Sequence, residues 1–220
     1  MIAIFGLLKA FEDLDYFYER GECKNPEDKI DVISLFVAIR FRAKDFTENY
    51  NNLENYYRCY FKDDDNEVVE KIFSSIDKLK NLYENEKENK SKSSLPIKTY
   101  KKIAKLLFGD ENYEVKLDDL KEILKEALDQ YLKENKDELN EKLYKIVIEV
   151  LNLETDSKDL IYNKLKEIKT KYKKLKEKYT DEKREILERI ITGVSSFGIL
   201  YSKLIILKKE KQKKPVKIVN

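Results

Sequence analysis

The stretch KDLIYNKLKEIKTKYKKLKEKY, residues 158–179, shows most clearly how this chain folds. Its apolar side chains recur at alternating intervals of four and three residues, at Ile161, Leu165, Ile168, Tyr172, Leu175 and Tyr179. This is the a/d spacing of a helix that packs along one side, and it is not the alternation of a strand. We therefore expect a helix of about two and a half heptads. Its apolar seam should pack inside its own chain or on an acidic partner.

Lysines flank this seam on both sides. Five of the six e and g positions beside it are occupied by Lys164, Lys169, Lys171, Lys176 and Lys178. In a parallel, in-register pair of copies these lysines would face one another and repel, so a self-pairing coiled coil is disfavoured. Two basic ridges beside a buried seam could straddle a phosphate backbone. The alternative is a helix whose stripe serves only the core and whose lysines are merely solvated.

The same helical periodicity runs through most of the chain. Apolar residues recur every three or four positions, and glycines follow two of the expected helices, Gly21 and Gly109. Five glycines and three prolines are too few for the turns of a many-stranded sandwich or barrel. We therefore expect an all-α protein, a multi-helix bundle of about nine helices, over 2–20, 26–41, 46–61, 64–83, 97–107, 119–131, 139–153, 158–179 and 181–209.

One polar stretch divides the chain. Residues 84–94 contain no apolar side chain and cannot bury surface, which is typical of a linker. We expect an N-terminal helical bundle over 1–84, a polar linker over 85–94, a C-terminal helical bundle with two long basic helices over 95–210, and a basic tail over 211–220.

Charge is distributed unevenly between the two ends of the chain. Residues 158–220 hold 19 Lys and Arg against 8 Asp and Glu, a net charge of +11. The preceding 157 residues hold 26 against 35, a net charge of −9. Such asymmetry points to an anionic partner for the C-terminal third, or to packing of one half on the other.

The residues that most enzymes use are missing. Histidine is absent, which excludes Ser-His-Asp and Cys-His catalysis and histidine-containing zinc sites. No glycine-rich phosphate loop or nucleophile elbow occurs. We therefore expect that the protein is not an enzyme and that it binds no cofactor, metal ion or small-molecule substrate. A catalytic site built from carboxylates, lysine or tyrosine stays possible. Two isolated cysteines, Cys23 and Cys59, and the lack of a signal peptide favour a cytoplasmic protein.

Three further segments could carry a function. Arg40, Arg42 and Arg58 lie among aromatic residues that could stack unpaired bases, although the aromatic stripe over 46–61 also suits a helix core. Asp63 to Asp65 could hold Mg²⁺, but such a run more often caps a helix. Residues 190–207 approach the length of a membrane span, yet suit a buried core helix better.

These observations predict a non-enzymatic helical subunit of a larger assembly that binds nucleic acid. Lysines without arginine-rich reading elements would contact the phosphate backbone without sequence specificity. The alternative is a protein-interaction scaffold whose basic C-terminal half docks on an acidic partner or an anionic membrane surface. The candidate nucleic-acid-binding residues are Lys164, Lys169, Lys171, Lys176, Lys178, Lys208, Lys209, Lys213 and Lys214.

Overall fold

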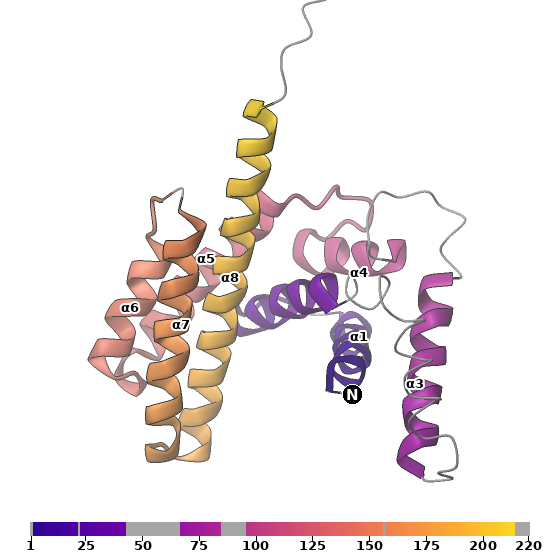
Figure 1. Ribbon diagram of the computed structural model, residues 1–220, viewed down its shortest axis with the longest axis horizontal. Helices are drawn as coiled ribbons and strands as arrows, with labels where there is room; N and C mark the ends of the chain where they lie inside the picture. Colours follow the sequence, from indigo (N-terminus) through magenta and orange to yellow (C-terminus); the bar gives the residue numbers. More distant parts are fainter. Residues whose placement is uncertain (1, 22, 43–66, 85–95, 156, 214–220) are drawn as a thin grey trace, which may run out of the picture. The chain divides into compact units, whose positions relative to one another are not determined.

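The described part of the protein is all-helical (Figure 1). A computed structural model describes residues 2–21, 23–42, 67–84, 96–155 and 157–213 of the chain. Over these residues there are eight α-helices and two short 3-10 turns, and no strand. The predicted all-α fold is confirmed.

The helices follow the sequence prediction closely. Their bounds are α1 (Ile2–Arg20), a helix over 26–42, α3 (Glu67–Glu84), α4 (Ile97–Phe108), α5 (Leu117–Glu134), α6 (Glu141–Leu151), α7 (Lys158–Leu175) and α8 (Asp181–Lys213), with the 3-10 turns η1 (Lys136–Glu138) and η2 (Lys176–Lys178). The described residues thus hold eight helices where about nine were expected. The remaining one, predicted over 46–61, lies outside the described residues.

Local signals end and separate the helices. Gly21 and Gly109 adopt positive φ angles of 68° and 77° directly after α1 and α4, as expected of glycines at the C′ position. Ser157 caps α7, because its Oγ accepts a hydrogen bond from the N–H of Leu160 at 3.3 Å. The backbone becomes extended at Tyr179, so α7 and α8 are two helices and not one.

The chain divides into two compact units. Unit 1 comprises 1–23 and 35–114, and unit 2 comprises 24–34 and 115–220. The helix over 26–42 therefore contributes to both units. The expected linker over 85–94 lies outside the described residues, and α4, which was assigned to the C-terminal bundle, belongs to unit 1.

Unit 1 is built around α1, which packs against α3 and α4. Leu7 and Leu14 of α1 and Ile103 of α4 are fully buried. Phe36, from the second half of the 26–42 helix, contacts the Tyr100 ring edge to face at 5.8 Å.

In unit 2, α8 is the central helix and packs against α5, α6 and α7. Figure 1 shows α7 and α8 side by side, with α6 next to α7. Two glycines let α8 approach its neighbours closely. A Cβ at Gly193 would lie 2.8 Å from side-chain atoms of both Ile30 and Leu128, and one at Gly198 would lie 2.7 Å from Leu165 Cδ1.

The prediction of two long basic C-terminal helices is correct for α7 and wrong for α8. Helix α8 is apolar and buried along its middle, through Leu187, Ile190, Val194, Phe197 and Leu200, because it forms the core of unit 2. Among the described residues, α8 is the one helix that is both long enough and apolar enough to cross a membrane. Of the most apolar stretch of α8, 61% is buried against the rest of the fold, as expected of a core helix.

Candidate nucleic-acid interface

The apolar seam of α7 packs inside its own chain. Ile161, Leu165 and Ile168 are buried, and Leu165 lies directly against Gly198 of α8. The sequence allowed the seam to pack on its own chain or on an acidic partner, and it packs on its own chain. Since α7 is fixed by these contacts, the lysines beside the seam hold defined positions on the surface of unit 2.

The seam is less buried toward its end, because α7 stops at Leu175. Tyr172 is half-buried and donates a short hydrogen bond from its hydroxyl to Glu188 of α8. Burial, together with this bond to a carboxylate, raises the pKa of Tyr172 to about 12. The hydroxyl therefore stays protonated and fixes the second half of α7 to α8.

Two of the predicted lysines are neutralised within unit 2. Lys164 Nζ lies 2.5 Å from a carboxylate oxygen of Glu149 on α6, which raises the lysine pKa and lowers that of the glutamate. Lys171 forms an ion pair with Glu167 at 3.1 Å. Both lysines lie on the side of α7 that faces α6. Because each already has an acidic partner, they are poor candidates for phosphate contacts.

The other side of α7 carries a row of lysines without acidic partners. We define the α7 lysine row as Lys158, Lys166, Lys169, Lys173 and Lys176. Steps of eight, three, four and three residues place these side chains on one side of the helix. The first four are exposed and the last is half-buried, and none forms an ion pair among the described residues. Tyr162 lies within the row, 43% exposed, with the Lys158 ammonium 5.4 Å from its ring centre.

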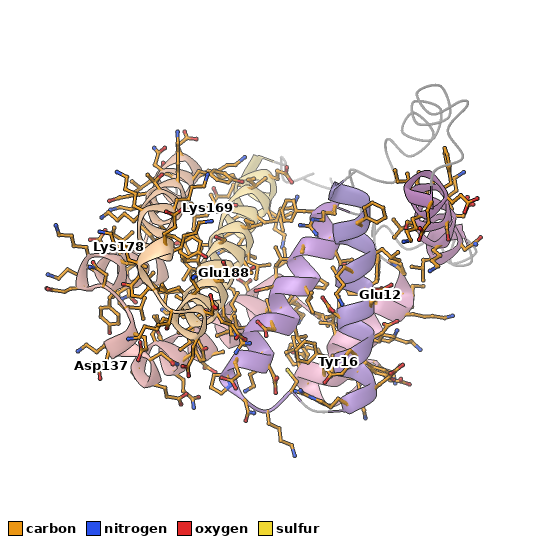
Figure 2. All side chains as sticks on the ribbon, turned by 90° about the horizontal axis from the view of Figure 1, so that it is seen from below. Glu12, Tyr16, Asp137, Lys169, Lys178 and Glu188 are labelled. Carbon is orange, nitrogen blue, oxygen red and sulfur yellow. The ribbon has the colours of Figure 1, made fainter. Side chains whose placement is uncertain are left out.

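The heptad spacing predicts part of this row. Lys169 and Lys176 occupy e positions and were predicted, whereas Lys166 and Lys173 occupy b positions and were not. The signal was available, because an e position and the neighbouring b position lie on the same side of a heptad helix. Lys178 is also exposed, in η2 just beyond the row. Figure 2 labels Lys169 and Lys178 on the part of unit 2 formed by α6, α7 and α8.

The lysines at the end of α8 form a separate group. Lys208 and Lys209 are exposed, the backbone of Lys213 is helical, and Lys214 lies outside the described residues. Helix α8 runs back along α7, as the contacts of Gly198 with Leu165 and of Glu188 with Tyr172 show. Residue 208 therefore lies about 40 Å along α8 from its start beside η2. The predicted residues do not converge on one point but extend along the α7–α8 pair.

A polar cavity of about 420 Å³ opens in the same unit. Its walls come from α5, from the end of α6 with the residues that follow it, and from α8. Two lysines, two glutamates and two aromatic rings are among the residues that line it: Lys121, Lys125, Glu122, Glu154, Phe197 and Tyr201. The Lys121 ammonium lies 5.4 Å from the Tyr201 ring centre and 3.1 Å from a carboxylate oxygen of Glu122.

Unit 1 has a cavity of similar size, about 410 Å³, between α1, α3 and α4. Charges of both signs line it, and one such pair, Lys102 and Asp15, forms an ion pair across it.

A charged cluster joins α8 to the 26–42 helix within unit 2. Arg189 of α8 lies 3.5 Å from a carboxylate oxygen of Asp31 and 4.0 Å from one of Glu27. Burial raises the pKa of Asp31 to about 6, although the attraction of Arg189 opposes this shift. The pair is long, and the carboxylates of Asp28, Glu27 and Glu185 repel the Asp31 charge, so burial outweighs the ion pair.

The remaining sequence candidates are only partly described. Arg40 and Arg42 end the 26–42 helix, while Arg58 and Asp63 to Asp65 lie outside the described residues. Among the described residues, no group of three or more carboxylates or thiols is placed to hold a metal ion.

Comparison with known proteins gives no relative: no family model, no curated protein and no solved structure matches this chain.

Proposed function

We propose that unit 2 binds the phosphate backbone of nucleic acid through the α7 lysine row, without sequence specificity and without catalysing a reaction. The observation that carries the proposal is the contrast between the ion-paired and the unpaired lysines of α7. Lys164 and Lys171, on the side toward α6, pair with glutamates, whereas the lysines of the row have no acidic partner among the described residues. An exposed lysine without a partner keeps its full charge for an external anion.

The shape of the row suits a polyanion that extends in one direction. From Lys158 to Lys173 it runs about 22 Å along α7 at 1.5 Å per residue, and Lys176 follows at the start of η2. Neighbouring lysines from Lys166 onward are about 4.5 to 6 Å apart along the axis. Each strand of a duplex carries one phosphate per about 3.4 Å of axis, which is closer than the spacing of the lysines, so the part of a strand that passes α7 offers a phosphate to each lysine it meets.

The absence of arginine from the row argues against base reading. Arginine reads guanine edges through two parallel hydrogen bonds, whereas a lysine ammonium acts as a point charge. The proposed contacts are therefore electrostatic, and the affinity should depend on salt more than on sequence.

The test is a direct binding measurement with a charge-matched control. The row variant carries Lys166→Gln, Lys169→Gln, Lys173→Gln and Lys176→Gln, because glutamine removes the charge and keeps helix propensity. The control variant carries the same change at four exposed lysines elsewhere in unit 2, Lys116, Lys133, Lys142 and Lys145. Binding to labelled single and double strands of mixed sequence is followed by fluorescence anisotropy at low salt.

The row variant should lose roughly tenfold or more in affinity, while the control stays within about twofold of wild type. Equal losses in both variants would mean that only net charge matters, and would overturn the assignment to the row. Loss only on changing Lys208, Lys209, Lys213 and Lys214 would move the site to the end of α8. No binding of the wild type at low salt would reject the nucleic-acid function and favour an acidic protein partner.

A further inference from the structure

The cavity between α5, α6 and α8 has features that suit the binding of a nucleobase. Its volume of about 420 Å³ lies within the range of small-ligand pockets and exceeds what a single water-filled gap requires. Three separate elements form its walls, so it is built by the fold of unit 2 and not by one mobile side chain.

An aromatic wall is its first relevant feature. Phe197 and Tyr201 lie one turn apart on α8, with ring centres 6.2 Å apart and planes at 27°. Phe197 is buried in the core, while Tyr201 is half-buried and lines the cavity. A nucleobase that displaces the Lys121 ammonium from over the Tyr201 ring can stack on that ring.

Positive charge next to the ring is the second feature. Lys121 lies over Tyr201 and pairs with Glu122. Lys125, one turn further along α5, also lines the cavity and has no ion pair among the described residues. A flat ring beside an unneutralised ammonium matches a nucleotide, which joins a flat base to a phosphate.

The cavity also lies at the end of α7 where the lysine row begins. Leu151 to Glu154 line the cavity, and the chain then reaches Lys158 within a few residues. Tyr201 lies three residues after Gly198 on α8, and Gly198 packs against Leu165 in the first half of α7. Because the row lies on the side of α7 away from α6, a strand that follows the row past Lys158 reaches the cavity by passing around the start of α7.

We propose that this cavity receives an unpaired nucleobase of a single strand, stacked on Tyr201 with its phosphate near Lys125. This inference rests on the proposed function and deepens it, because it makes single-stranded nucleic acid the preferred ligand. A base inside a duplex is stacked and paired, and cannot enter such a cavity without being flipped out.

The experiment separates stacking from charge. The probes are a single-stranded oligothymidylate of about 12 nucleotides, an abasic strand of the same length, a duplex of the same length, and thymidine monophosphate. Tyr201→Leu removes the ring and keeps an apolar side chain, whereas Tyr201→Phe keeps the ring. The control is Tyr144→Leu, because Tyr144 lies on α6 outside the cavity lining and also has a lysine, Lys136, over its ring. Circular dichroism and thermal unfolding verify that each variant is folded.

Wild type should bind the base-containing strand about five- to a hundredfold more tightly than the abasic strand. Tyr201→Leu should abolish this difference and leave duplex binding unchanged, while Tyr201→Phe and Tyr144→Leu preserve it. Lys125→Gln should weaken single-strand binding and lower its salt dependence, with no effect on the duplex.

Two outcomes would overturn the inference, and they differ from failure of the proposed function. If the base-containing and abasic strands bind equally and Tyr201→Leu changes nothing, while the row variant still weakens binding, the backbone function stands and the base site falls. If thymidine monophosphate binds at Tyr201 but no strand does, the cavity takes a free nucleotide and both proposals fail.

Discussion

At the scale of single residues, close packing around α8 decides how unit 2 tolerates change. In an exposed helix, Gly→Ala stabilises by about 1 kcal/mol, because alanine restricts the unfolded chain and favours the helix. At Gly193 the added methyl group would lie 2.8 Å from Ile30 Cγ2 and from Leu128 Cδ2, both in the core. Overpacking of this kind reverses the sign of the usual effect.

Gly193→Ala should therefore destabilise the protein by about 1 to 3 kcal/mol. Gly6→Ala is the matched control, because the new methyl group would meet only the end of the exposed, flexible Arg42 side chain. Gly6→Ala should leave the free energy of unfolding unchanged or raise it by up to about 1 kcal/mol. Urea unfolding of the two variants tests the pair, and a Gly193→Ala protein as stable as wild type would contradict the packing described for α8.

Asp31 makes a second residue-scale prediction, on pH. Its folded-state pKa of about 6 lies above the unfolded value of 3.8. A raised folded pKa contributes stability that is fully present below about pH 4 and is lost as pH rises through about 6. Asp31→Asn removes this loss, so its stability relative to wild type should increase between about pH 4 and pH 7.

The expected increase is roughly 1 to 2 kcal/mol, since partial exposure of Asp31 screens the full effect of the shift. Arg189, Glu27, Asp28 and Glu185 all act on the Asp31 charge and are unchanged in the variant. The measurement is the free energy of unfolding of both proteins across this pH range. A difference that stays constant with pH would show that Asp31 titrates normally.

At the scale of elements, α7 separates a packing surface from a binding surface. Leu165 of the seam is buried at 6% exposure, while Leu160 at the start of the same helix is 42% exposed. Leu165→Ala should destabilise by about 2 to 4 kcal/mol, and Leu160→Ala by less than about 1 kcal/mol. Thermal unfolding distinguishes them. Equal, small effects would mean that the seam is unpacked and free for a partner.

The helices of this fold were predictable because each carries its own signal. The three- and four-residue spacing of Ile161, Leu165 and Ile168 required a helix with one buried side, and Gly21 and Gly109 marked two helix ends. The start of α5 was predicted less well. Asp119 was expected to open it, but the helix begins at Leu117, since acidic residues are also favourable within a first turn.

The candidate site was predictable only in part. Sequence spacing placed lysines on both sides of the seam, but which side is neutralised depends on α6, whose Glu149 is 15 residues from Lys164. The cavity joins residues of α5, α6 and α8, and no local pattern connects Lys125 with Tyr201. The apolar run of α8 was ambiguous between core and membrane, because that choice depends on what surrounds it.

At the scale of the whole molecule, the charge asymmetry of the sequence has a structural location. The excess of +11 over residues 158–220 belongs to α7, η2, α8 and the residues beyond them. In α8 the lysines avoid the buried middle and gather toward its end, while α7 is basic along its length. The positive charge available to a ligand therefore follows α7 and continues at the end of α8.

The measurement that tests the central claim most directly is the salt dependence of duplex binding. For a duplex, each lysine that neutralises a phosphate contributes about 0.9 to the magnitude of the slope of log affinity against log salt concentration. The row variant, which lacks four lysines, should therefore have a slope smaller in magnitude than that of wild type by about 3.6, while the control variant keeps the wild-type slope. An unchanged slope in the row variant would contradict the claim that the α7 lysine row contacts the phosphate backbone.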